Sequence, residues 1–222
     1  MSNTRTIHIK GTGTASAAPD FVVITLELRA QHMEYANVMR IGAQQVEMLR
    51  EAVSEAGFVA EDLKTTDFSV DAEYENEEHE ENGRTRYHRV FTGYVCKHSL
   101  KLSFDMDNER IEKAMTAIGG CLSKPEVSIA FTVKDKLAMR DKVLESAAQD
   151  ARRKAEILCK ASGVALGDLI RIEYSWGEIN ITHSLDLKMD DCMSMAEAAP
   201  SYDFHPDDIE AGDTVDFYWE IR

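Results

Sequence analysis

A repeat inside the chain constrains its fold more strongly than any other feature of the sequence. Ala56–Leu63 and Ser162–Leu169 each contain a glycine that is followed five residues later by Asp-Leu, and the matched positions lie 106 residues apart. The match continues without a gap into Phe68–Val70 and Tyr174–Trp176. Self-similarity of this kind predicts that the chain contains two repeats of one structural unit.

Apolar residues at steps of three and four precede the matched glycines, Gly57 and Gly163, and predict one long amphipathic helix in each repeat. Both glycines stand where a helix ends in the left-handed conformation, which glycine adopts at little cost. The second helix is rich in alanine, so it can lie close to a sheet. The apolar stripes are Tyr35, Val38, Met39, Gly42, Val46, Leu49, Val53 and Ala56 in the first repeat, and Leu144, Ala147, Ala148, Ala151, Ala155, Leu158 and Cys159 in the second.

Alternation of apolar and polar residues predicts three half-buried strands in each repeat, one before the helix and two after it. In the first repeat these are Val22–Leu28, Phe68–Tyr74 and Tyr94–Phe104, and in the second Val127–Val133, Ile170–Trp176 and Val215–Ile221. Alternation leaves one polar sheet face, which is typical of antiparallel sheets. We therefore predict an α+β fold of duplicated strand–helix–strand–strand units, with a mostly antiparallel sheet and two long helices packed on one face.

The predicted organisation has three parts. Residues 1–106 hold the first repeat with an extra N-terminal strand, Thr6–Thr14. Residues 107–124 form a short connecting helix, for which Asp107 is the expected N-cap. Residues 125–222 hold the second repeat with a long acidic insert, 177–213. The two repeats either share one core or form two abutting subdomains.

In the order of its motifs, the chain resembles the SIMPL-domain family. These motifs are Gly11 and Gly13, Pro19-Asp20, Gly93-Tyr94, the alanine-spaced helix ending at Gly163 with Leu166-Gly167 after it, and Gly212 before the final alternating segment. The resemblance spans nearly the whole chain. It implies an oligomeric protein of largely unknown function, akin to envelope, immunogenic or kinase-associated members, and a link to oxidative stress. It carries over no catalytic residue.

Charge and hydropathy exclude several classes of protein. The net charge of −15 argues against a nucleic-acid partner, because phosphates require a basic surface. No apolar run has the length of a secretory signal or a membrane span, so we expect a cytoplasmic protein although many relatives are exported. The four cysteines are widely and irregularly spaced, which indicates reduced thiols; they are Cys96, Cys121, Cys159 and Cys192.

The acidic excess lies in two segments that join the second and third strands of each repeat. Residues 71–83 hold seven acidic residues and no Lys or Arg, and residues 186–213 hold nine with one lysine. We interpret both as solvent-exposed loops. Their candidate metal ligands are Glu77, Glu78 and His79 in the first loop and His183, Asp190 and Asp191 in the second. The spacing of calcium loops and of zinc ligands is absent, so no metal site and no cofactor is predicted.

The remaining motifs favour binding over catalysis. Gly11-Thr12-Gly13 lacks the third glycine and the helix of a nucleotide site, so we interpret it as a turn or a close strand contact. His98 is interpreted as a hydrogen-bonded core or interface histidine, and no nucleophile motif is present. Three methionines in the acidic insert are candidate oligomer contacts: Met189, Met193 and Met195.

We therefore predict a non-enzymatic assembly or binding module of the SIMPL type that forms a homo-oligomer, without catalytic residues. Two alternatives stay open. One is an uncharacterised hydrolase or small-molecule-binding enzyme with a site between the two repeats. The other is a cation-binding protein that uses the acidic loops 71–83 and 186–213.

Overall fold

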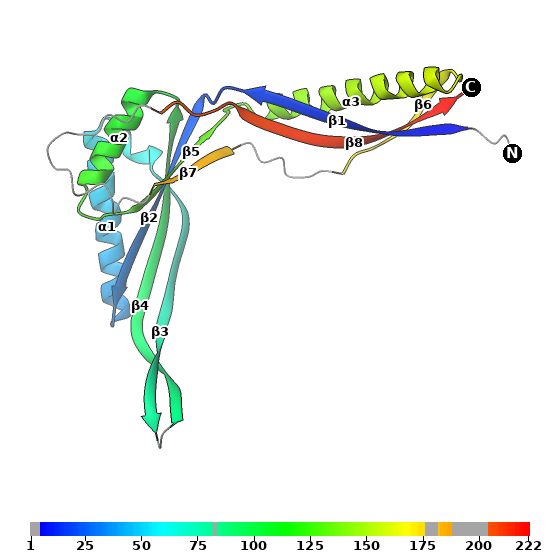
Figure 1. Cartoon of the computed structure of the whole chain (residues 1–222). Helices are drawn as coiled ribbons and strands as arrows, with labels where there is room; N and C mark the ends of the chain where they lie inside the picture. The colour runs from blue at the N-terminus through cyan, green and yellow to red at the C-terminus, as the bar shows by residue number, and fades with distance from the viewer. Residues whose placement is uncertain (1–4, 82–83, 176–181, 188–203) are drawn as a thin grey trace. The chain divides into compact units, whose positions relative to one another are not determined.

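The computed structural model describes residues 5–81, 84–175, 182–187 and 204–222, and for residues 77, 79–81, 84–86 and 182–187 it describes the backbone alone. Long helices pack against antiparallel strand pairs, which confirms the predicted α+β class. The strands form two separate sheets, and each has a long helix on one face (Figure 1).

The chain divides into two units, and each unit draws on separated parts of the sequence. Unit 1 comprises Met1–Asp20, Phe131–His183 and Pro206–Arg222. Unit 2 comprises Phe21–Ala130 and Ser184–His205. Neither unit is one uninterrupted repeat, because each sheet takes strands from both.

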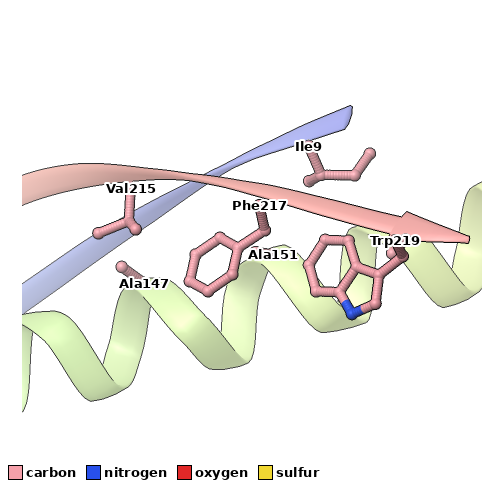
Figure 2. Packing of buried hydrophobic residues seen from close by; sticks show 7 residues of the cluster. Ile9, Ala147, Ala151, Val215, Phe217 and Trp219 are labelled. Carbon is pink, nitrogen blue, oxygen red and sulfur yellow. The ribbon is translucent and has the colours of Figure 1, made fainter. Parts of the chain in front are cut away.

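Unit 1 contains a three-stranded sheet in the order β1-β8-β6, with helix α3 packed on one face. Its elements are β1 (Thr6–Ala17), α3 (Lys136–Ala161), β6 (Leu166–Glu173) and β8 (Ile209–Ile221). In Figure 2 the apolar side chains of β8 and Ile9 of β1 meet the alanines of α3. These alanines are fully buried, because their small side chains let the helix approach the strands closely. The buried cluster is Ile9, Ala147, Ala151, Ala155, Val215, Phe217 and Trp219.

Unit 2 is built around a sheet in the order β3-β4-β2-β5-β7, and helix α1 packs over β2 and β4. Its elements are β2 (Phe21–His32), α1 (Tyr35–Glu55), η1 (Ala60–Asp62), β3 (Lys64–Glu81), β4 (Arg84–Asp105), α2 (Asn108–Gly120), β5 (Glu126–Thr132) and β7 (Thr182–Leu187). Alternate residues of β2 face the helix, and Val22, Ile24 and Leu26 are fully buried.

The ends of the helices follow the sequence prediction. Gly57 and Gly163 have φ angles of 92° and 71°, so each is in the left-handed conformation just after its helix. The Asp107 carboxylate accepts hydrogen bonds from two backbone N–H groups at the start of α2, and Asp135 accepts one at the start of α3. The middle of the first predicted stripe is buried, and Ala147, Ala151 and Ala155 of the second are buried too. The stripes were wrong at Tyr35, Met39, Ala148 and Leu158, which are exposed.

Strands β1 and β5 lie in sheets that their positions in the sequence do not predict. Segment Val127–Val133 was expected to open the second repeat, yet β5 lies beside β2 in the sheet of unit 2. The extra N-terminal strand β1 instead pairs with β8, from Thr6 opposite Glu220 to Ala17 opposite Ile209. The repeat boundaries stay a prediction about the sequence, and the sheets are assembled across them.

The interpretation of residues 71–83 as a loop was wrong. Asp71–Glu81 belongs to strand β3, which pairs with β4 as far as Glu81 opposite Arg84. Strand β2 ends at His32 opposite Tyr94, so beyond this point β3 and β4 form a two-stranded ribbon. Water reaches both faces of such a ribbon, and the apolar alternation that predicts the strand stops at Tyr74, so no pattern marks the rest of it. The end of the acidic insert is also strand, because β8 begins at Ile209.

Candidate functional site

Most of the candidate metal ligands lie at positions whose side chains the structure does not describe. Glu78 is exposed on β3, and Glu77 and His79 lie in the same strand, where only the backbone is described. His183 lies in β7, also described by its backbone alone, and Asp190 and Asp191 lie outside the described residues. Among the described residues, no group of three or more His, Cys, Asp or Glu side chains is placed to hold a metal ion. Met189, Met193 and Met195 also lie outside the described residues.

Two open hollows of about 630 Å³ each occur on the surface of unit 2. One lies between α1 and η1, with Glu47, Glu51 and Glu61 around Arg50. The other lies between α1 and α2, and its residues are Ala52, Glu55, Ala56, Glu109, Glu112, Lys113, Thr116, Ala117 and Gly120. The lining of these two hollows contains neither histidine nor cysteine, so they hold no pairing of a nucleophile with an imidazole base.

His98 and the three described cysteines are partly or fully buried, and Cys192 lies outside the described residues. His98 Nε2 lies 2.8 Å from Thr65 Oγ1, and its ring meets Phe68 edge to face, which confirms the predicted hydrogen-bonded histidine. Burial, together with the charge of Arg50, lowers the pKa of His98. Burial raises the pKa of the Cys96 thiol, which makes the reactive thiolate scarce. Cys96, Cys121 and Cys159 are buried and free, as the spacing predicts.

The edges of the two sheets differ sharply in their chemistry. At an edge, backbone N–H and C=O groups have no neighbouring strand, so the edge is a place where another chain can pair. The structure describes the side chains at three edges, namely those of β1, β3 and β6.

Helix α3 covers the edge of β1. The Thr12 N–H donates to Asp150 Oδ2 at 3.0 Å, and the Thr14 N–H donates to Ser146 Oγ at 3.3 Å. Lys154 Nζ donates to the carbonyl of Lys10 at 3.3 Å. Four residues of an α-helix rise about 6 Å, and two residues of a β-strand rise about 6.7 Å. Ser146, Asp150 and Lys154 of α3 therefore stay level with alternate residues of β1. This edge is therefore closed to another strand.

The charges around Asp150 reinforce this cover. Lys154, the Thr12 N–H and Arg153 hold the pKa of Asp150 well below its usual range. Arg153 and Lys154 each lie 2.6 Å from a carboxylate oxygen of Asp150. The sequence interpretation missed this group, although Ser146, Asp150 and Lys154 recur every four positions and each stands directly before a buried alanine of the helix. That spacing, opposite the alternating glycines of β1, is the signal that could have found it.

Acidic side chains protect the edge of β3. Exposed carboxylates recur along the strand, and strands so charged resist pairing with another strand. Glu73 on the same strand is half-buried and forms an ion pair with Arg29 at 2.6 Å. The carboxylates on this strand with described side chains are Asp67, Asp71, Glu73, Glu75 and Glu78.

No described element covers the edge of β6, and this strand carries two carboxylates and one arginine, against five described carboxylates on β3. Leu169, Ile170 and Ile172 are about half exposed, at 47%, 53% and 52%. Helix α3 packs on β1 and β8 and makes little contact with β6. Strand addition uses such an edge, because backbone hydrogen bonds supply affinity while alternate side chains supply specificity. Of the three edges with described side chains, this one is suited to binding.

Side chains on the face away from α3 hold β6 against β8. Arg171 lies over the ring of Tyr218, with 4.3 Å from its Cζ to the centroid, and His8 stacks on the same ring. Tyr218 donates a hydrogen bond to Glu173 Oε2 at 3.1 Å, which raises the pKa of the phenol. These contacts anchor β6 on its inner side, so its outer side is presented on a supported strand.

Comparison with known proteins identifies a family. The family model described as "SIMPL: Protein of unknown function (DUF541)" matches residues 7–219. No curated protein matches the chain. Among the described helices, none is long and apolar enough to cross a membrane.

Proposed function

This chain belongs to the SIMPL family of proteins of unknown function, and from that premise we propose that it is a non-enzymatic assembly module that forms a homo-oligomer. The observation that carries the proposal is the edge of β6, with three half-exposed apolar side chains beside unpaired backbone groups. A stress-related role, which the family resemblance implies, would be exercised through this assembly.

Energetics favour a partner on this edge. Completing the burial of Leu169, Ile170 and Ile172 would contribute about 1 kcal/mol for each side chain, since each is already half buried. Pairing also replaces water on the outer N–H and C=O groups with protein hydrogen bonds. The two hollows of unit 2 offer carboxylates without these apolar contacts, so β6 is the better supported site.

Sedimentation velocity of the full chain, over a wide range of micromolar concentrations, tests the proposal. We expect a defined oligomer for the wild type and a shift to monomer for the double variant Ile170→Lys/Ile172→Lys, because two charges would be buried at the contact. Leu122→Lys is the matched control, since Leu122 is 85% exposed and lies in unit 2. Circular dichroism checks that each variant is folded. A wild type that stays monomeric at the highest concentration would refute the proposal.

A further inference from the structure

Strand β3 has an acidic face, an apolar face and an open edge between them. We infer that this edge binds an extended peptide segment of another protein in which basic and apolar residues alternate. The contact runs along residues 67–75 of unit 2. The proposed assembly uses β6 of unit 1 and does not depend on this contact.

The backbone of this part of β3 is paired on one side only. Strand β4 lies along its inner side, from Phe68 opposite His98 to Glu75 opposite Val90. In the order of the sheet β3 is the outermost strand, so no described strand lies along its outer side. Such an edge offers N–H and C=O groups to an added strand, and the hydrogen bonds that form there supply affinity.

Carboxylates occupy one face of β3, because they stand at alternate positions of the strand. Asp67, Asp71 and Glu75 are exposed, and no described cation forms an ion pair with any of them. Glu73 on the same face is already paired with Arg29 of β2. Basic residues of an added strand that lie beside the three exposed carboxylates are therefore held by opposite charge.

Apolar side chains occupy the other face of the same stretch. Phe68 and Tyr74 are 47% and 44% exposed, and Ala72 between them is exposed as well. On their inner sides Phe68 meets His98 and Tyr74 meets Phe91, both of β4. Helix α1 packs over β2 and β4 and makes little contact with β3, so no described helix covers the outer sides of these rings. Apolar residues of an added strand complete their burial.

The alternation of the two faces selects one class of partner. A basic residue at every second position of the added strand faces the carboxylates, and the residues between them face the rings. A second copy of β3 brings carboxylates of its own, and like charges across a pair of strands are unfavourable. The carboxylates that protect this edge from another acidic strand therefore favour a strand of opposite charge.

An acidic hollow adjoins the start of this edge. Leu63, which directly precedes β3, is part of its lining. Three carboxylates and one guanidinium line the same hollow, and they belong to Glu47, Glu51, Glu61 and Arg50. The Arg50 guanidinium lies 3.8 Å from the Glu47 carboxylate, so two negative charges are left in excess. With a volume of about 630 Å³, the hollow has room for a further lysine or arginine side chain at the end of the bound segment.

Calorimetric titration of the full chain with synthetic peptides as long as residues 67–75 tests this binding. One peptide alternates lysine and valine, and a second has the same composition with all its lysines before its valines. We expect the alternating peptide to bind one to one, and at least about tenfold more tightly than the second, because only alternation serves both faces of β3. Its affinity should fall as salt is added. A third peptide, with glutamate in place of lysine, should not bind.

Reversal of charge on β3 gives the matched variants. In Asp71→Lys/Glu75→Lys we expect the affinity for the alternating lysine peptide to fall at least about tenfold, and the glutamate peptide to bind instead. Asp141→Lys/Glu145→Lys changes the same number of charges at exposed positions of α3 and should bind like the wild type. Circular dichroism checks that both variants are folded. In the wild type, bound peptide should slow amide hydrogen exchange along residues 67–75.

Equal affinity for the two lysine peptides, or an equal loss in both variants, indicates a general attraction by net charge and overturns the inference. Slower exchange at β6 in place of β3 overturns it too, and so does an alternating peptide that fails to bind. The oligomeric state of the chain does not enter these measurements, so failure here and failure of the proposed assembly are distinguishable.

Discussion

At the scale of single residues, two absent side chains decide how unit 1 packs. A Cβ atom on Gly11 would overlap the carbonyl oxygen of Ala147, and one on Gly13 would overlap that of Val143. Backbone oxygens cannot rotate away as a side chain can, so a methyl group at either glycine would push the helix off the strand. The Gly-x-Gly motif is thus a site of close contact, as the sequence interpretation expects.

Substitution of one of these glycines measures that contact. We expect Gly11→Ala to lower the free energy of unfolding by about 3 kcal/mol, in the upper range for an overpacked core. Gly120→Ala is the control, because nothing lies within 4 Å of a Cβ built there. Equilibrium unfolding in guanidinium chloride gives both values. If the two variants are equally stable, the helix is not held against the strand at this position.

At the scale of elements, the contact between α3 and β1 depends on an ionised carboxylate. Asp150 accepts the Thr12 N–H while Arg153 and Lys154 contact its oxygens. These interactions favour the charged form, so the pKa of Asp150 is lower in the folded chain than in the unfolded one. Asp150 therefore adds stability above its unfolded pKa of about 3.9, and this stability is lost as the pH falls from there toward the folded pKa.

Asp150→Asn should show this dependence on pH. We expect the variant to be less stable than the wild type at neutral pH, and the difference in unfolding free energy should shrink as the pH falls below about 4. Urea unfolding at a series of pH values provides the measurement. Asp141→Asn, an exposed position on the same helix, serves as the comparison and should show no such trend. A difference that stays constant down to pH 2 would contradict the linkage.

Elements were predictable where local chemistry decides them. The left-handed glycines after α1 and α3 and the carboxylate cap of α2 follow from short sequence patterns. The exchange of β1 and β5 between the two sheets was not predictable in this way. Alternation shows which face of a strand is apolar, but it does not show which strand lies beside it. For the same reason, Ile170 and Ile172 indicate a half-buried strand, and the sequence does not distinguish an edge strand from a central one.

At the scale of the whole molecule, the acidic excess has a structural reason on β3. Its carboxylates line a long edge that would otherwise attract other strands, while β1 is covered by a helix and β6 is left apolar. Among the three edges with described side chains, one is charged, one is covered and one is open, and this arrangement favours β6 as the edge for the proposed association. Net charge alone suggests general repulsion between copies. The distribution of charge indicates instead that the edges differ in how strongly they repel another copy.

Removing the charges from the edge of β3 should therefore create a second edge at which copies of the chain pair with one another. We expect Asp67→Asn/Asp71→Asn/Glu75→Gln to aggregate with rising concentration, because its backbone groups then lie beside neutral side chains. Light scattering measures this. The control, Glu51→Gln/Asp141→Asn/Glu145→Gln, removes the same number of charges from exposed helix positions and should scatter like the wild type. If both variants aggregate equally, net charge keeps the copies apart; if only the first does, the position of the carboxylates matters, and β6 is the edge left free for assembly.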